Sequence, residues 1–412
     1  MPVLWWRGKI WSKRAKTDFV WGGDALINYK YYARAVGETG KKAYTLVDRI
    51  PQHAFSREDF DLVYDDLAPT LLSGTKAWSL LRGYAAALHI MKHAAVYHMS
   101  YTGGPLRATP LRWFEASFFR IANVKTVVSS FGSDFWRYSL IIDGRVKQAM
   151  MLNYKEMGRL EPQVDRQVRY WVKNADIVVG TTSTDGLGYW DCMISNPVCV
   201  NVEAWPVRTD WSEADGVNAP VKIVHAPNHR GVKGTEFFLA SVDRLRADGL
   251  KIEFVLLERM PNPVVLDHLR TADICLDQCA SGMGYGLFAI ESMASGSVVI
   301  GNLEDPYRID LHRQYCYMQE CPLVSTDVER LLFTLRLLVG NPSLRRTLGQ
   351  MGREFVNRYH SGNAMKYYFS LLYRKLLDDP DLDIALPFHP LLSDYSNQWK
   401  KLAPPLHRNR LY

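Results

Sequence analysis

The feature that most constrains this chain is an alternation of short apolar runs with amphipathic helical patterns, which occurs twice. In the first half, apolar runs predict buried strands at 43–47, 94–98, 125–129 and 175–179, and helical patterns fall at 25–36, 77–92, 111–121 and 163–173. Strands that alternate with helices indicate parallel βαβ units. We therefore expect a doubly wound, Rossmann-like α/β domain.

A turn-rich polar stretch at 205–220 interrupts this rhythm, and the alternation then restarts. The second half predicts strands at 221–226, 252–257, 274–276 and 298–300, and helices from Thr235 (a plausible N-cap), at 261–270, at 287–294 and through most of 327–377. We expect an N-terminal domain at 1–206, a linker at 207–220, a C-terminal domain at 221–360, and a helix and tail at 361–412 that pack back on the first domain. Two such domains facing a cleft would bind a ligand at the carboxyl ends of their strands.

Composition indicates a folded chain with a preference for anionic partners. Hydrophobic residues make up 47% of the 412 residues and charged residues 23%, and the formal net charge is +7. This positive charge favours binding of nucleotide phosphates or anionic lipid headgroups, although a mildly basic surface without such a partner would have the same net charge. No basic run or recognition-helix pattern stands out, so we expect no nucleic-acid partner.

The six cysteines predict neither a disulfide framework nor a metal site. They lie at 192, 199, 275, 279, 316 and 321, with no C-x-x-C pair and no common zinc spacing. Scattered thiols in a chain of this length favour the cytoplasm. No apolar stretch approaches the length of a membrane-spanning helix.

The first candidate ligand segment is residues 225–235, HAPNHRGVKGT, which follows a predicted strand and opens a helix. Gly231 and Gly234 would allow close backbone approach, and the helix start would supply free N–H groups. Arg230 and Lys233 add positive charge, and the histidines at 225 and 229 add donors. This combination suits a diphosphate, although a solvated basic loop with a helix cap would look the same.

The second candidate segment is residues 281–291, SGMGYGLFAIE, in which three glycines precede a helix. Its loop would again present backbone N–H groups to an anion. Glu291 lies in an otherwise apolar helical segment, where a carboxylate needs a partner to stay charged. The two hydroxyls of a ribose would provide one; the alternative is a glutamate on the wet face of the helix.

Taken together, residues 225–301 resemble the donor half of family 4-type glycosyltransferases, the glycosyl transferases group 1 type. Residues 286–296, GLFAIESMASG, are similar to the signature G-L-x-x-x-E-A-M-A-x-G; 272–274 resemble its A-D-I strand start, and 233–234 its K-G. The N-terminal half is similar only through Gly22-Gly23 and Gly132-Ser133-Asp134. The resemblance implies a B-type fold and sugar transfer from a nucleotide diphosphate donor, usually with retention, with no bound metal and no further cofactor.

The resemblance also implies roles for individual residues. Lys233 would contact the diphosphate, Glu291 the ribose, and the loop residues Gly284, Tyr285, Gly286 and Leu287 the phosphate and sugar. Gly22 and Gly23 would form the facing loop of the first domain.

Three positions depart from the family pattern. Met283 stands where a first glutamate is usual, Asn228 where a phosphate-binding arginine is usual (with Arg230 as a nearby substitute), and Phe131 where a histidine is common. Asp134 or His98 could then serve as the acceptor-side base.

Two Trp- and Phe-containing segments raise the question of a membrane surface. Residues 1–16 are Trp-rich and basic, and residues 105–121 interleave arginines with aromatics. Both suit a membrane interface. For each, the alternative is a segment packed on the fold, with snorkelling arginines in the second case.

The sequence therefore predicts a cytoplasmic glycosyltransferase of surface polysaccharide or glycoconjugate synthesis, peripheral to the inner membrane face, with a glycan or lipid-linked acceptor. One rival is a catalytically weakened pseudo-glycosyltransferase that binds nucleotide or glycan inside an assembly. A sugar-nucleotide epimerase or a phosphorylase is another.

Overall fold

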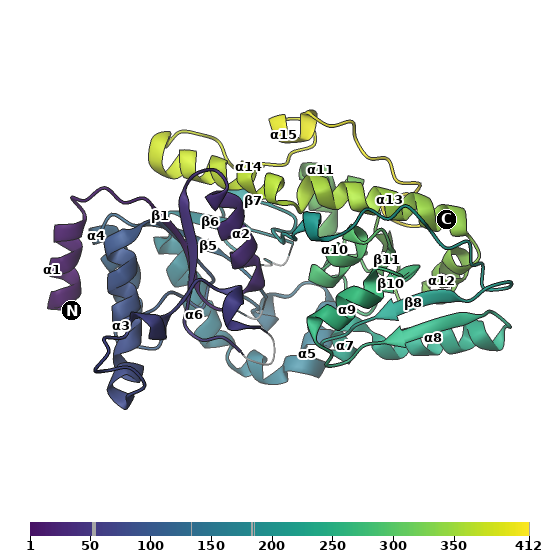
Figure 1. Ribbon diagram of the computed structural model, residues 1–412, viewed down its shortest axis with the longest axis horizontal. Helices are drawn as coiled ribbons and strands as arrows, with labels where there is room; N and C mark the ends of the chain where they lie inside the picture. The colour runs from purple at the N-terminus through teal and green to yellow at the C-terminus, as the bar shows by residue number, and fades with distance from the viewer. Residues whose placement is uncertain (52–54, 133, 183, 185, 412) are drawn as a thin grey trace. The chain divides into compact units, whose positions relative to one another are not determined.

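The computed structural model (Figure 1) describes residues 1–411 apart from 52–54, 133, 183 and 185. The chain divides into two compact units. Unit 1 comprises Met1–Arg137, Leu160–Met193 and Met365–Pro387, and unit 2 comprises Tyr138–Arg159, Ile194–Ala364 and Phe388–Tyr412. Each unit is built on its own parallel sheet, which confirms the expected pair of Rossmann-like α/β domains.

Unit 1 holds a seven-stranded sheet of order β3-β2-β1-β4-β5-β6-β7, in which every paired strand is parallel. The strands are β1 (Asp18–Gly23), β2 (Lys42–Val47), β3 (Leu62–Val63), β4 (Ala94–Met99), β5 (Lys125–Ser129), β6 (Ile177–Gly180) and β7 (Cys192–Met193). The helices are α1 (Pro2–Trp11), α2 (Ile27–Gly37), α3 (Lys76–His93), α4 (Glu115–Ile121), α6 (Glu161–Asn174) and most of α14 (Gly362–Tyr373). Strands β1 and β4 are buried along their whole length.

Strand β1 is the one central strand that the sequence pattern did not reveal. It ends in Gly22 and Gly23, which were expected to form a loop. A Cβ on Gly22 would lie 2.1 Å from the carbonyl oxygen of Leu46, so close pairing with β2 requires glycine there. Gly23 has φ +84°, which also favours glycine. The pair therefore belongs to the end of a strand, and the expectation of a Gly22-Gly23 loop was wrong.

Unit 2 holds a five-stranded parallel sheet of order β12-β11-β10-β8-β9. Its strands are β8 (Val221–His225), β9 (Ile252–Leu256), β10 (Ile274–Leu276), β11 (Val298–Gly301) and β12 (Val324–Ser325). Its helices are α5 (Gly144–Arg159), α7 (Arg230–Lys233), α8 (Thr235–Ala247), α9 (Asn262–Leu269), α10 (Leu287–Ala294), α11 (Ile309–Tyr315), α12 (Leu331–Val339), α13 (Pro342–Tyr359) and α15 (Asp394–Asn397). Buried apolar side chains of β8, β10, β11, α8 and α12 form its core.

The strand order of unit 2 fixes where a ligand site is expected. From β8 the chain moves outward to β9, and then returns to place β10 on the other side of β8. The connections therefore leave β8 and β10 in opposite directions. The crevice beyond the carboxyl ends of two such strands is where open α/β sheets bind ligands.

The division of the chain differs from the predicted one in several places. Of the tail that was expected to pack on the first domain, Met365–Pro387 belongs to unit 1 but Phe388–Tyr412 belongs to unit 2. Helix α5 comes from the N-terminal half of the sequence but belongs to unit 2, where it contacts α7. Residues 205–220 also belong to unit 2 and are tied to it. Arg208 donates to the carbonyl of Ala272 at 2.8 Å, and the Trp211 indole donates to the carbonyl of Gly296 at 3.1 Å. The polar stretch is thus packed on one unit rather than free as a linker.

Candidate nucleotide-binding site

Two loops that overlap the candidate segments 225–235 and 281–291 meet at the β8–β10 crevice. Residues 226–234 follow β8, and residues 277–286 follow β10, its direct neighbour in the sheet. The contact is close: a Cβ on Gly234 would lie 2.6 Å from the Cys279 sulfur, and the Cys279 N–H donates to the Lys233 carbonyl at 3.1 Å. The two loops thus form one continuous surface at the edge of the sheet.

Lys233 is held in this surface by a carboxylate that sequence reasoning missed. Its ammonium lies 2.6 Å from Oδ1 of Asp277, whose side chain has no solvent exposure. The other oxygen of Asp277 accepts the Gly286 N–H at 3.4 Å. One buried carboxylate therefore links the lysine of the first loop to the glycine segment of the second. The sequence did contain a signal for Asp277: it and Gln278 are polar residues directly after a buried parallel strand, where ligand sites are expected.

Arg230 and Asn228 contribute less to the site than the sequence suggested. The Arg230 guanidinium pairs with Glu236 at 2.7 Å and with Glu258 at 2.9 Å, at a largely exposed position. Two carboxylates thus already offset its charge. Asn228 is exposed. The expectation that Arg230 replaces a phosphate-binding arginine finds no support in this arrangement.

His225 and Thr235 have structural roles in this unit. Nδ1 of His225 lies 2.7 Å from the carbonyl oxygen of Leu276, and Nε2 lies 2.9 Å from Oγ1 of Thr235. Burial lowers the pKa of His225 to about 4, so the ring is neutral near pH 7. His225 therefore ties β8 to β10 and α8 rather than offering a donor to a ligand. Thr235 is not the N-cap of α8, since the cap is Gly234 with φ +77°.

Side-chain hydrogen bonds to backbone carbonyls hold the glycine-rich loop 282–286 in place. The amide of Gln278 donates to the Gly284 carbonyl at 2.5 Å, and the amide of Asn196 donates to the Tyr285 carbonyl at 2.6 Å. Gly284 has φ +90°. The Tyr285 ring is buried, with its hydroxyl 2.9 Å from Nε2 of His360. Tyr285 can therefore meet a ligand only through its backbone, while Leu287 starts α10 directly after the loop.

Glu291 lies in α10, one turn beyond this loop. The residue is only 9% exposed, and burial raises the pKa of its carboxyl from 4.5 to about 7. No hydrogen bond or ion pair reaches its carboxylate from the rest of the described chain. A buried carboxyl in this state gains free energy from any ligand that donates hydrogen bonds to it.

The candidate bases of unit 1 occupy closed environments. His98 lies in β4, stacked on Trp21 at 4.5 Å between ring centroids and hydrogen-bonded to the Tyr373 hydroxyl at 3.0 Å. Burial lowers its pKa to about 3. A neutral ring inside the core is not placed to accept a proton from a substrate.

Asp134 is a loop anchor in the structure. Its carboxylate accepts N–H groups from Tyr101 at 3.0 Å, Phe131 at 3.0 Å and Gly132 at 2.9 Å. Burial raises its pKa to about 7, against the effect of these three bonds. Phe131 itself is 44% exposed. Ser133, part of the same predicted motif, lies outside the described residues.

The interleaved aromatics of 105–121 divide between the core and the surface. Phe118 and Phe119 are buried, whereas Phe114 is 45% exposed. The guanidinium groups of Arg112 and Arg166 lie 4.4 and 4.5 Å from the centroid of the Trp113 ring. The alternative of a packed segment therefore holds for Phe118 and Phe119, and the membrane contact of this segment stays a prediction.

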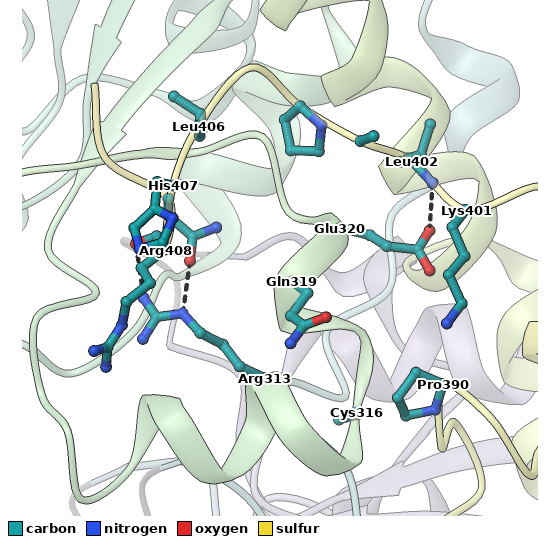
Figure 2. A pocket seen from close by; sticks show the side chains of 13 residues that line it. Arg313, Cys316, Gln319, Glu320, Pro390, Lys401, Leu402, Leu406, His407 and Arg408 are labelled. Atoms are coloured by element: carbon teal, nitrogen blue, oxygen red, sulfur yellow. Dashed lines mark hydrogen bonds between the residues drawn. The ribbon is translucent and has the colours of Figure 1, made fainter. Parts of the chain in front are cut away.

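A pocket of about 390 Å³ lies elsewhere in unit 2, between α11 and the C-terminal tail (Figure 2). Arg313 on its wall donates to Asn409 Oδ1 at 3.0 Å, and Glu320 accepts the Leu402 N–H at 3.1 Å. These bonds hold the tail in place. None of the residues that line the pocket belongs to the two loops described above.

In the part of the chain that the structure describes, no group of three or more His, Cys, Asp or Glu side chains could hold a metal ion. All six cysteines are described, and all are buried free thiols. No helix among the described residues is long and apolar enough to cross a membrane.

Comparison with solved structures identifies the architecture. The chain is similar to Anabaena Alr3699/HepE in complex with UDP-glucose, with a TM-score of 0.52 and 10% identity over 86% of this chain and 98% of that one. It is also similar to an alpha-glucosyltransferase in complex with UDP-glucose and DNA containing an abasic site, with a TM-score of 0.53 and 8% identity over 88% of this chain and 100% of that one. The fold is that of the B-type glycosyltransferases.

The fold that the sequence resemblance implied is therefore confirmed, while membership of family 4 is not singled out. No family model matches the sequence, and no curated protein does.

Proposed function

We propose that this chain is a glycosyltransferase that takes a sugar from a nucleotide diphosphate donor bound at the β8–β10 crevice. The observation that carries the proposal is Glu291, a buried carboxyl with a raised pKa beside a glycine loop at the switch point of the sheet. A ribose diol would donate to both of its oxygens. The two glycosyltransferases with the same fold are in complex with UDP-glucose, which agrees with a nucleotide-sugar donor.

Lys233 and the loop around Gly284 and Gly286 would bind the diphosphate. Departure of the nucleotide concentrates negative charge on its terminal phosphate, and a fixed ammonium with preorganised N–H groups stabilises that charge. Because Asp277 already holds Lys233 in place, little reorganisation is needed when the charge develops. The proposed reaction uses neither a metal ion nor a further cofactor.

The acceptor and setting of the reaction are also proposals. We infer transfer with retention, because the candidate bases His98 and Asp134 are both buried and hydrogen-bonded. The acceptor would be a glycan or a lipid-linked glycan of surface polysaccharide synthesis, and the six reduced thiols agree with the cytoplasm.

Release of nucleoside diphosphate from a panel of nucleotide-sugars, with glycan and lipid-extract acceptors, tests this function. We expect release from one donor that depends on acceptor, and loss of release in Glu291→Ala. Glu329→Ala, at an exposed position, is the matched control and should behave as the parent protein. An epimerase would convert the donor without acceptor and without release. A protein that binds the donor but never releases nucleotide would be the pseudo-enzyme.

A further inference from the structure

Helix α1 precedes the first strand of unit 1 and is not part of its βαβ alternation. One face of α1 is fastened to the unit through Leu4, Gly8 and Trp11, which are buried and spaced four and three residues apart. A Cβ on Gly8 would lie 3.0 Å from the Met91 side chain of α3 and 3.1 Å from that of Ile121 of α4. The glycine therefore lets α1 lie flat against these two helices (Figure 1).

The opposite face of α1 is apolar as well, which is unusual for a helix on a protein surface. Trp5 is 46% exposed and Trp6 55% exposed, and Val3 and Ile10 are exposed beside them. Exposed tryptophans at such density mark a surface that is covered in use. Indole rings combine apolar area with an N–H donor, and they favour the boundary between lipid headgroups and acyl chains.

The charges around these tryptophans all have one sign. Arg7, Lys9, Lys13 and Arg14 are exposed, and residues 1–17 contain no acidic side chain. The Lys9 ammonium lies 3.8 Å from the centroid of the Trp5 ring, so cation and aromatic are presented together. The supporting helices α3 and α4 add one acidic residue, Glu115, which is buried and accepts backbone N–H groups.

We propose that the outward face of α1 docks unit 1 on a bilayer that contains anionic lipids, with Trp5 and Trp6 inserted at headgroup depth and the four basic side chains in contact with lipid phosphates. The buried face of α1 stays on α3 and α4, so docking needs no unfolding of the unit. This surface goes beyond the transfer reaction and does not depend on it, although it would bring the enzyme to a lipid-linked acceptor.

Co-sedimentation of the full chain with vesicles tests the proposal. Vesicles of phosphatidylcholine alone are compared with vesicles that also contain phosphatidylglycerol, and brominated lipids report tryptophan insertion by quenching. We expect the parent protein to bind the anionic vesicles, with weaker binding at high salt. Trp5→Ala with Trp6→Ala should lower partitioning roughly tenfold or more and abolish the quenching.

Two further variants separate the contributions. Lys9→Ala with Lys13→Ala should lower partitioning to anionic vesicles about 25-fold and leave binding to phosphatidylcholine unchanged, because each basic residue near an anionic surface contributes about fivefold. Phe237→Ala with Phe333→Ala removes two aromatics of matched exposure, 46% and 53%, from unit 2 and should change nothing. Unchanged melting of every variant shows that the fold is kept.

Three outcomes would overturn the proposal. They are a parent protein that stays in the supernatant with anionic vesicles, a Trp5/Trp6 variant that binds as the parent does, or tryptophan-dependent self-association without vesicle binding. The last would assign the surface to a second copy of the chain. Nucleotide-sugar turnover in the absence of vesicles would be unaffected in each case.

Discussion

The Lys233 ammonium lies 2.6 Å from the carboxylate of Asp277, whose side chain is fully shielded from solvent. This pair joins the loop after β8 to the loop after β10, and it places one fixed cation where a diphosphate would bind. The contributions of Lys233 to stability and to ligand binding can be measured separately, because Lys233 and Asp277 can be substituted singly or together.

Lys233→Met should leave the Asp277 charge buried without its partner, and we expect unfolding free energy to fall by about 3 kcal/mol in urea titrations. Lys233→Met combined with Asp277→Asn removes both charges and should recover most of that loss. Neither variant should bind a nucleotide diphosphate. If the double variant bound like the parent, Lys233 would be a structural residue only.

Arg230→Ala should have a small effect on nucleotide affinity, within about threefold. Its guanidinium is bound by Glu236 and Glu258 at an exposed position, where ion pairs contribute little. Calorimetric titration beside Lys233→Met makes the comparison. A loss as large as that of the lysine variant would show that Arg230 changes partners when the ligand binds.

Affinity for a nucleotide-sugar should rise with pH around neutrality. The pKa of Glu291 is raised to about 7 in the free protein, and a ribose diol donates best to the ionised form. We expect affinity about tenfold weaker at pH 6 than at pH 8, and a flat profile in Glu291→Gln. A nucleotide-sugar is the suitable probe, because its diphosphate does not titrate in this range. The same slope in both proteins would remove Glu291 from the site.

Gly234→Ala should destabilise unit 2 by about 2 kcal/mol through backbone strain, and by more through steric overlap. Gly234 has φ +77°, and a Cβ there would lie 2.6 Å from the Cys279 sulfur. Gly249→Ala is the control, since φ is +90° but no atom lies within 4 Å of a Cβ there. The difference between the urea unfolding midpoints of the two variants measures the cost of the steric overlap with Cys279. Equal midpoints would mean that the two loops separate at little cost.

Acid should destabilise the protein through its buried neutral histidines. The pKa of His98 falls from 6.5 in the unfolded chain to about 3 in the fold, so the unfolded state binds more protons below pH 6.5. The contribution of neutral His98 to the free energy of unfolding is complete above pH 6.5. It decreases as the pH falls toward 3, and at pH 5 it is about 2 kcal/mol smaller. The free energy of unfolding of His98→Phe should therefore fall less between pH 7 and pH 5 than that of the parent protein, by the contribution of His98. Guanidinium unfolding at the two pH values measures it, and an unchanged difference would contradict the buried neutral state.

The sequence was most informative where a run of residues has one simple environment. Strand β5 at Lys125–Ser129 and helix α10 at Leu287–Ala294 fall where the patterns placed them, because each is a mostly apolar run with a buried centre or end. Strand β1 was missed because its packing uses glycine, which carries no hydrophobic signal. Helix α5 was not predicted, and nothing local in the sequence shows that it packs on α7 in unit 2.

The residues of the candidate site likewise fall into those that the sequence indicated and those that it did not. Lys233 and Glu291 could be proposed from the sequence because they stand at fixed distances from glycines in a familiar pattern. Asp277, Gln278 and Asn196 were not found, since their roles depend on loops brought together from different strands. Conversely, Arg230 and His225 looked like ligand contacts from charge and type, and the fold gives each of them partners within the chain.

Direct titration of the purified protein with nucleoside diphosphates tests the central claim most directly. Calorimetry with the uridine, guanosine, cytidine, adenosine and thymidine diphosphates should show saturable one-to-one binding of at least one of them. That binding should be lost in Glu291→Ala and in Lys233→Met with Asp277→Asn, and kept in Glu329→Ala. Absence of binding with all five nucleotides, or equal binding in all four proteins, would contradict a donor site at the β8–β10 crevice.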